Sequence, residues 1–266
     1  LTLLRSAATG IAPYVSNETL VVSESTSYPG TLRSEIAARI SGVQHLYASS
    51  PERVDPGNTQ WGTKNTPRLI GGLTQAAVLR AKEFYGTFCD SIIEVSSPEV
   101  AEAAKIFENT FRQVNIALVN EFAQIADALG ISVHETLDAA NTKPYGFMKF
   151  TPGAGVGGHC IPIDPIYLAE KAESAGAPAS LIRSADQINA QMSKFVMDKA
   201  IRLLGSDLSG KKVCIVGLSY KSDISDLRSS PSLALWDLLE AAKAQVSYHD
   251  SFHPAFRGKN SSDLST

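Results

Sequence analysis

The residue of this sequence best placed for covalent chemistry is Cys160, which follows a glycine-rich segment. Four glycines lie within the six residues from Gly153 to Gly158, and His159 directly precedes the cysteine. Glycine lets the backbone adopt positive φ and approach a ligand closely. A thiol presented by such a loop is therefore a candidate nucleophile. The alternative is a buried cysteine after a flexible turn, since free cysteine usually packs as a small apolar residue.

Polar residues elsewhere could complete a reaction at this thiol. Lys105 and Asn109 are one helical turn apart, and Glu24 and Glu52 follow predicted strands. Aldehyde oxidation through a thioester needs such a set: lysine and asparagine donate to an oxyanion, and a carboxylate or hydroxyl positions the hydrolytic water. The alternative is that the lysine and asparagine, with Arg112, form the solvated face of an amphipathic helix.

The first third of the chain alternates strand-like and helix-like segments. We expect a helix over 1–16, helices near 31–40 and 74–85, and strands at the following positions: 20–23, 43–49, 68–72 and 91–95. This alternation predicts a parallel sheet with helices on its faces. Ligands of such sheets bind at the carboxyl ends of the strands, which here carry Glu24-Ser25-Thr26 and Ser50-Pro51-Glu52.

A long helix is expected over 98–129. Ser96 or Ser97 can cap it, Pro98 suits its first turn and Gly130 can end it. At 1.5 Å per residue, such a helix is roughly 48 Å long. This length predicts a helix that joins domains or forms a subunit interface.

The last part of the chain reads as further helices and a second strand–helix–strand unit. Helices are expected over 132–139, 164–176, 180–204 and 231–242, and strands over 211–219 and 245–250. Cys214 lies between apolar residues in the first of these strands and is expected in the core. Gly217 alone does not make a G-x-G-x-x-G fingerprint, so a dinucleotide site is not predicted there.

Composition excludes several classes of function. The 266 residues are 44% hydrophobic, which allows a sizeable core, and the net charge is −3 with no basic run, so we predict no nucleic-acid or anionic-membrane binding. No apolar run reaches membrane-spanning length. The three cysteines are far apart and odd in number, which favours neither a disulfide framework nor a metal site and indicates a reducing, cytoplasmic location.

Five ordered motifs resemble those of the UDP-glucose/GDP-mannose dehydrogenase family. They are Thr26 with Pro29-Gly30-Thr31, Ser50-Pro51-Glu52, Lys105-x-x-x-Asn109 with Asn120-Glu121, Gly155-Val-Gly-Gly-His-Cys160 with Pro162 and Asp164, and Gly217-Leu-Ser-Tyr-Lys221 with Asp226, Arg228 and Ser230-Pro231. The resemblance implies an α/β protein with three parts. These are the C-terminal part of a Rossmann-like NAD-binding domain (1–96), a central helical, dimer-forming domain (97–206) and the start of a UDP-binding domain (207–266).

The resemblance also implies an activity. Family members oxidise the C6 alcohol of a UDP-sugar to a uronic acid with two NAD, by a thiohemiacetal and a thioester on Cys160. The implied catalytic residues are Cys160, Lys105, Asn109, Asp164, Glu52 and Thr26. The implied substrate contacts are Arg112, Gly155, Gly157, Gly158 and Lys221. The implied cofactor contacts are Ser25, Thr26, Glu52 and Arg228.

Two departures bear on the substrate and on activity. His159 and Ile163 replace the residues usual in UDP-glucose members, and the resemblance is nearer to members that act on 2-acetamido sugars, with UDP-N-acetylglucosamine favoured. The G-x-G-x-x-G strand–loop–helix that binds the NAD pyrophosphate is absent from these 266 residues. We therefore expect this chain to be a fragment without turnover of its own.

Three other functions stay open at this point. A two-electron hydroxyacid dehydrogenase also has a K-x-x-x-N pair on a helix and would leave Cys160 dispensable. A cysteine hydrolase using Cys160 and His159 would act without NAD. A scaffold built on the long helix would leave Cys160 no more reactive than Cys89 and Cys214.

Overall fold

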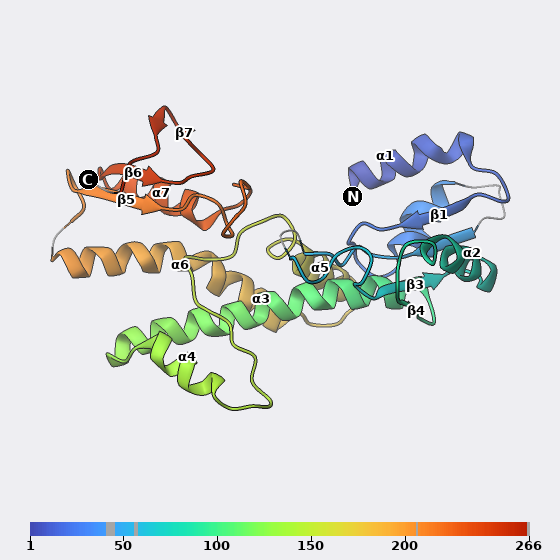
Figure 1. Ribbon diagram of the computed structural model, residues 1–266, viewed down its shortest axis with the longest axis horizontal. Helices are drawn as coiled ribbons and strands as arrows, with labels where there is room; N and C mark the ends of the chain where they lie inside the picture. Colours follow the sequence, from blue (N-terminus) through green and yellow to red (C-terminus); the bar gives the residue numbers. More distant parts are fainter. Residues whose placement is uncertain (41–45, 56–57, 206, 265–266) are drawn as a thin grey trace. The chain divides into compact units, whose positions relative to one another are not determined.

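The computed structural model describes residues 1–40, 46–55, 58–205 and 207–264 (Figure 1). Its contacts divide the chain into two compact units. The first comprises Leu1–Asn109 and Asp164–Pro178, and the second comprises Thr110–Ile163 and Ala179–Thr266. The boundaries proposed from the sequence, after residues 96 and 206, follow a different criterion and stay a prediction.

A four-stranded sheet forms the centre of the first unit. Its strands are β1 (Leu20–Ser23), β2 (Leu46–Ser49), β3 (Arg68–Gly72) and β4 (Ile92–Glu94), in this spatial order. β1 is parallel to β2 and β3 is parallel to β4, whereas β2 and β3 are antiparallel. The sequence-based expectation of a purely parallel sheet misses this one pair. A parallel partner needs a crossover, usually helical, and the described part of the 50–67 segment is loop, so the chain turns back.

Helices of the first unit agree with the expected positions, with one local difference. α1 (Thr2–Ile11) ends in a 3₁₀ turn, and α2 (Gln75–Tyr85) begins where the Thr74 hydroxyl accepts the Ala77 N–H at 3.2 Å. α2 packs on the sheet through a core of these residues: Ala48, Ile70, Val78, Ala81 and Tyr85. α5 (Asp164–Ser174) also belongs to this unit.

The helix expected over 31–40 is irregular. It consists of a π-helical turn at Leu32–Ile36 and a 3₁₀ turn at Ala37–Arg39. Thr31, at the start of this segment, makes no side-chain cap and instead donates its hydroxyl back to the Tyr28 carbonyl at 2.6 Å. The Leu32 amide is taken by a distant carboxylate, that of Glu102, at 2.8 Å. This contact between residues 70 positions apart has no local signal.

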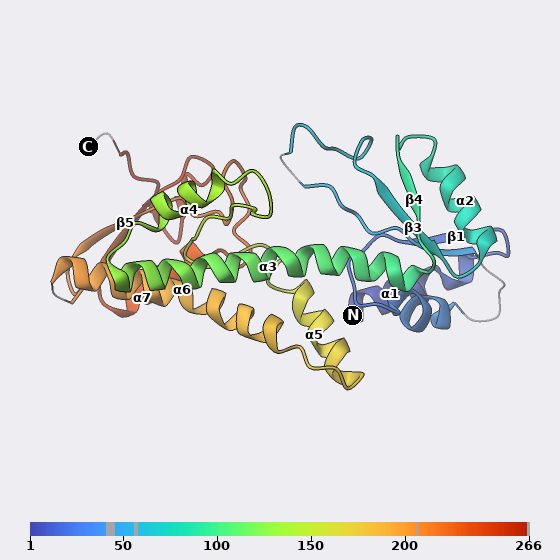
Figure 2. The same cartoon turned by 90° about the horizontal axis from the view of Figure 1, so that it is seen from below.

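The long helix α3 (Pro98–Leu129) has the bounds expected from its capping residues (Figure 2). The Ser97 hydroxyl accepts the Val100 N–H at 3.3 Å, and Gly130 follows the helix with a positive φ of 68°. α4 (Val133–Asn141) and α6 (Ser180–Leu204) belong to the second unit, and Gly205 ends α6 in the left-handed conformation. None of the helices in the described ranges is long and apolar enough to cross a membrane.

The second unit contains the predicted strand–helix–strand. β5 (Lys212–Val216) and β6 (Gln245–His249) are parallel, and α7 (Pro231–Ala241) packs beside them around Trp236, Leu239 and Tyr248. A short antiparallel hairpin, β7 (Ala255–Phe256) and β8 (Lys259–Asn260), follows β6.

Cys214 is exposed, so its expected core position is wrong. Side chains alternate between the two faces of a strand. Ile215 is buried and Val213 packs on the core, whereas Cys214 and Val216 lie on the opposite, exposed face.

Candidate functional site

The carboxyl ends of β1 and β2 bring two predicted site segments together. Beyond the strands, the Ser50 N–H donates to the Ser23 carbonyl at 2.9 Å and the Glu52 N–H donates to the Glu24 carbonyl at 3.0 Å. The parallel pairing therefore continues into the loops and aligns Glu24 with Glu52. Carboxyl ends of parallel strands are where ligands of such sheets bind.

Glu52 is held from three sides. One carboxylate oxygen accepts the amides of Arg53 and Val54, each at 2.8 Å, and the other accepts the Arg68 guanidinium at 3.1 Å. Partial burial acts to raise the pKa of Glu52, but these two amides and the Arg68 charge outweigh it and leave the pKa below its usual value. Glu52 is therefore ionised at neutral pH and suits proton acceptance or electrostatic support, not proton donation.

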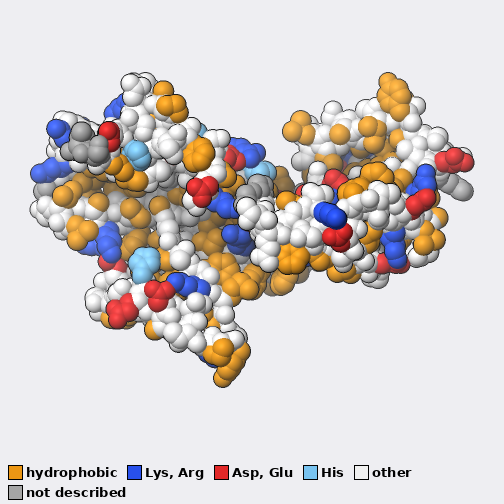
Figure 3. All heavy atoms as spheres, viewed as in Figure 1, with side chains coloured by type: hydrophobic (Ala, Val, Ile, Leu, Met, Phe, Trp, Pro, Cys, Tyr) orange, Lys and Arg blue, Asp and Glu red, His pale blue; other side chains and the backbone are white. Residues whose placement is uncertain are grey.

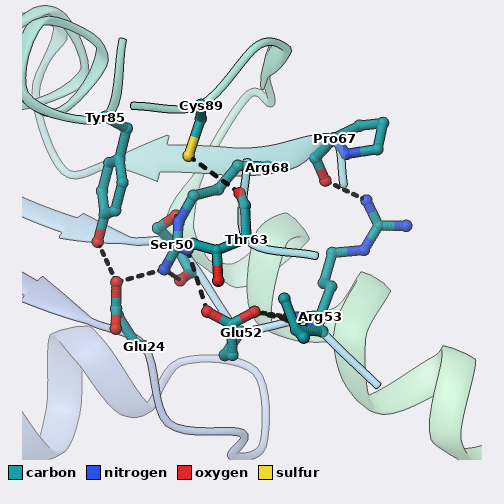
Figure 4. Close-up of polar contacts among 10 residues, drawn as sticks. Glu24, Ser50, Glu52, Arg53, Thr63, Pro67, Arg68, Tyr85 and Cys89 are labelled. Atoms are coloured by element: carbon teal, nitrogen blue, oxygen red, sulfur yellow. Dashed lines mark hydrogen bonds and ion pairs between the residues drawn. The ribbon is translucent and has the colours of Figure 1, made fainter. Parts of the chain in front are cut away.

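Arg68 was not singled out from the sequence, yet it is the centre of this cluster (Figure 4). Its side chain is 6% exposed and lies against the Tyr85 ring, with 4.2 Å between the guanidinium carbon and the ring centroid. It also bonds the Glu24 carboxylate, to which the Tyr85 hydroxyl donates. The available signal was a cation that opens an otherwise apolar strand.

Asn109 and Asp164, two of the predicted catalytic residues, are in contact. The Asn109 amide donates to the Asp164 carboxylate at 2.6 Å, and the two residues are only 8% and 5% exposed. They come from α3 and from the first turn of α5. Lys105 is partly exposed one turn before Asn109. A buried amide–carboxylate pair is fixed in orientation and can hold a water or a reacting oxygen nearby.

The turn that carries Pro29, Gly30 and Thr31 is fixed by a residue the sequence did not indicate. Glu102 of α3 is 1% exposed, and its carboxylate accepts the N–H groups of Gly30 at 2.6 Å and Leu32 at 2.8 Å. Burial raises the pKa of Glu102 to about 7. The amides of this turn are occupied and cannot cradle a cofactor phosphate.

Replacing Glu102 by glutamine is expected to change how stability depends on pH. Between the ordinary pKa of 4.5 and the folded value of about 7, the folded chain binds the Glu102 proton more tightly than the unfolded chain. The free energy of unfolding should therefore fall as pH rises through this window, by about 3 kcal/mol from this group. Urea titrations at pH 5 and pH 8 measure the fall, and Glu102→Gln should largely lack it.

The matched control is Glu99→Gln, one turn earlier on the same helix. There burial acts to raise the pKa, but the hydrogen bond from Arg33 outweighs it and the pKa is lowered. The control should keep the fall between pH 5 and pH 8. An identical fall in wild type and Glu102→Gln would show that Glu102 does not cause the pH dependence.

Cys160 belongs to the second unit, at the end of the glycine-rich loop. It is partly buried, whereas His159 is exposed. The loop begins with the Gly153 N–H donating to the Asn120 side chain at 2.9 Å, and the Gly158 N–H donates to the Arg228 carbonyl at 2.9 Å. The thiol is therefore carried by a loop anchored at both of its ends.

The glycines of this loop serve close packing. A Cβ on Gly157 would lie 2.4 Å from the Tyr220 Cβ, and one on Gly158 would lie 3.0 Å from the Tyr220 ring. Gly155 and Gly158 also have positive φ values of 139° and 86°. Because these glycines have no side chain, the 217–231 segment can pack directly on the loop, a role that the sequence did not indicate.

Arg228, predicted to contact the cofactor, is engaged by a neighbour. Its guanidinium bonds both oxygens of Asp226, at 2.6 to 3.0 Å, and these bonds hold the pKa of Asp226 at about 2. The pKa of Arg228 is raised mainly by Asp226, with smaller contributions from Tyr220 and Cys160. The Arg228 cation thus lies within electrostatic range of the Cys160 thiol.

The remaining predicted residues lie on the surface or at its edge. Ser25 and Arg112 are exposed, and Thr26 and Lys221 are partly exposed. No group of three or more His, Cys, Asp or Glu side chains in the described part of the chain could hold a metal ion.

Three domain models of one protein family match consecutive parts of the chain. Residues 1–89 match the NAD binding domain of the UDP-glucose/GDP-mannose dehydrogenase family, residues 99–191 match its central domain and residues 214–264 match its UDP binding domain. The predicted fold class and the predicted cofactor, NAD, are thereby confirmed.

Individual relatives agree with the domain matches. A UDP-N-acetyl-D-mannosamine dehydrogenase of Methanocaldococcus jannaschii is 39% identical over 95% of this chain and 57% of its own length. A UDP-N-acetyl-D-glucosamine 6-dehydrogenase of Salmonella typhi is 36% identical over 86% of this chain and 56% of its own length. The solved UDP-D-ManNAc dehydrogenase of Pyrococcus horikoshii superposes with a TM-score of 0.85 at 34% identity, over 95% of this chain and 62% of that one.

The chain thus spans less than two thirds of the length of each of these relatives. All of the comparisons point to the same family. These are the three consecutive domain matches, the similar relatives, and the motif residues at the strand ends and in the cysteine loop. The chain belongs to the UDP-glucose/GDP-mannose dehydrogenase family.

Proposed function

We propose that the natural protein containing this chain oxidises the C6 alcohol of a UDP-2-acetamido-hexose to the uronic acid. The buried Asn109–Asp164 pair carries the proposal, because it fixes an amide and a carboxylate where sequence motifs predicted them. Names of the relatives support a 2-acetamido sugar and include both the manno and the gluco form. Of the two, we keep the gluco form, which the motif resemblance favours.

When bound, NAD would accept the two hydrides that leave C6. The described residues fit part of this cofactor: Ser25 and Thr26 offer hydroxyls at the carboxyl end of β1, and Glu52 offers an ionised carboxylate beside them. The 29–31 turn does not fit its pyrophosphate, because the Gly30 and Leu32 amides are occupied by Glu102.

The thiolate of Cys160 adds to the C6 aldehyde and forms a thiohemiacetal. Loss of the second hydride from C6 leaves a thioester, and water then hydrolyses it to the carboxylate and returns the thiol. In total, one alcohol and one water become one carboxylate, with two hydrides transferred and three protons released.

The other side chains stabilise charge or hold water in these steps. Lys105 and Asn109 donate to the oxyanions, which is electrostatic stabilisation of the transition state. Asp164, with Thr26, holds the hydrolytic water, and Glu52 remains ionised in support. Arg112, Lys221 and the glycine loop contact the UDP-sugar, and Arg228 faces the thiol and the cofactor.

The activity is tested with UDP-N-acetylglucosamine, UDP-N-acetylmannosamine and UDP-glucose in the presence of NAD. Two NADH per sugar and a uronic acid product are expected for a 2-acetamido sugar. One NADH per substrate, or turnover without NAD, would reject the proposal. The 266-residue chain by itself is expected not to turn over.

We also propose a homodimer through α3. In the second unit, its large apolar side chains Phe111, Leu118, Ile125 and Leu129 are exposed along one side at intervals of seven and four residues. Hydrophobic side chains also reach the surface along α3 in Figure 3. An exposed apolar stripe with heptad spacing fits a second copy of the same helix.

Replacing Leu118 by glutamate is expected to dissociate this dimer, because a charge would be buried between the helices. The control is Leu181→Glu on α6, where a leucine of similar exposure, 68% against 62%, lies outside the stripe. Sedimentation analysis measures the mass. A dimer that both variants preserve would place the interface elsewhere.

A further inference from the structure

Arg68 enters the candidate site from a strand that runs opposite to its neighbour. It is the first residue of β3, and β3 is antiparallel to β2, so its side chain lies at the carboxyl ends of β1 and β2. Figure 4 shows the guanidinium between Glu24 and Glu52, with Ser50 beside it. No sequence motif had assigned this residue a role.

The planar guanidinium of Arg68 donates hydrogen bonds to residues at the ends of two adjacent strands, β1 and β2. Nη1 donates to Glu52 at 3.1 Å, Nε donates to the Ser50 hydroxyl at 2.8 Å, and Nη2 donates to Glu24 and to the Ser50 carbonyl at 3.2 Å. Tyr85 covers the guanidinium plane. A buried cation in such a cluster is fixed in position, because any displacement breaks several hydrogen bonds together.

This arrangement is specific to arginine. A lysine ammonium is a point charge on a flexible stem and cannot serve the Glu24, Ser50 and Glu52 oxygens in one plane. These ion pairs are also weak evidence for stability, since desolvation of the buried Arg68 offsets much of its attraction to the half-exposed Glu24 and Glu52. A buried arginine that joins two carboxylates at the ligand-binding edge is therefore better explained by the position it imposes.

We propose that Arg68 is a positioning residue that fixes Glu52, ionised and oriented, at the active site. The inference rests on the proposed function, in which Glu52 acts as an ionised support. Arg68 affects the reaction only indirectly, by positioning Glu52 and Glu24. Charged and titratable groups around Glu52 come from its own loop, from the end of β1, from β3, from α2 and from α3: Arg53, Glu24, Arg68, Tyr85 and Glu108.

The first test compares Arg68→Lys with Arg39→Lys in the natural protein. Arg39 pairs with Glu35, away from the cluster, and serves as the matched control. We expect Arg68→Lys to lower kcat roughly ten- to hundred-fold, the effect of a misplaced catalytic group. The KM for the UDP-sugar should stay within about two-fold, and the acid limb of the pH profile should move to higher pH.

The second test does not need turnover. Carbon-13 NMR of glutamate-labelled protein, with Glu52→Gln for assignment, measures the pKa of Glu52 directly. It should rise in Arg68→Lys and stay unchanged in Arg39→Lys. If the wild type oxidises no UDP-sugar, the proposed function fails, while this titration still decides whether Arg68 controls Glu52.

A Glu52 that titrates alike in wild type and Arg68→Lys would overturn the inference. So would a loss of kcat that follows only the folded fraction, with the pH profile unmoved. If Arg68→Lys does not fold, Glu24→Gln replaces it. Arg68 should then turn fully to Glu52 and the pKa of Glu52 should fall further; an unchanged pKa of Glu52 would overturn the inference.

Discussion

Replacing Cys160 by serine is expected to abolish uronic acid formation while sparing some of the first oxidation. A serine hydroxyl is a far weaker nucleophile than a thiolate near neutral pH, and no thioester can form. We expect acid production to fall on the order of 10³-fold or more, as for other nucleophile replacements. The measurement is the ratio of NADH to uronic acid in the natural protein.

Cys89→Ser is the control for this variant. Cys89 is buried, its thiol donates to the Thr63 carbonyl at 3.5 Å and burial raises its pKa, so it should not react. Full four-electron turnover in Cys160→Ser would reject the thioester on Cys160. A hydroxyacid dehydrogenase would leave the cysteine dispensable, and a hydrolase would act without NAD.

The rate of Cys160 alkylation distinguishes an enzyme from a scaffold, provided that the exposed Cys214 is removed first. Cys214 is exposed, so its fast alkylation would carry no information about Cys160. The comparison is therefore made in a Cys214→Ser background. Modification of Cys160 no faster than that of buried Cys89 would favour the scaffold.

Replacing Gly157 by alanine is expected to destabilise the second unit. The added methyl would lie 2.4 Å from the Tyr220 Cβ, 2.9 Å from Pro231 Cδ and 3.0 Å from the Ser229 carbonyl oxygen. These are backbone-near atoms that cannot swing away. Overpacking of this kind costs about 1–3 kcal/mol, which urea denaturation measures as a lower midpoint.

Gly153→Ala is the matched control in the same loop. Its added methyl would meet only the Gly155 carbonyl oxygen, at 3.8 Å, and Gly153 does not have a positive φ. Its effect should stay within about 0.5 kcal/mol. Equal stability of the two variants would mean that the loop does not pack tightly on Tyr220.

Much of the secondary structure could be predicted from residues close to each other in the sequence. α3 has the bounds expected from Ser97, Pro98 and Gly130, because such residues act on positions a few residues away, and α6 also has its expected bounds. β1 and β3 also match, as short apolar runs between turns. The antiparallel pairing of β2 with β3 was missed, because a strand's direction depends on the path of the loop that precedes it.

The candidate site was predictable in its motif residues and not in its supports. Cys160, Asn109 and Asp164 were singled out from sequence motifs, and the structure brings Asn109 and Asp164 into contact. Arg68, Glu102 and Tyr220 act across 16 to 72 positions, or by filling the space that a glycine leaves. Cys214 was misplaced for the same reason: which face of a strand is covered depends on what packs there.

The contact between the cysteine loop and the 217–231 segment has a mechanical consequence. Gly157 leaves no clearance over Tyr220, and the Gly158 amide is bonded to the Arg228 backbone, so these two segments are locked in register. A displacement of the start of the UDP-binding region would drag the thiol with it. Under the proposed function, nucleotide binding and the position of the Cys160 thiol would therefore be coupled.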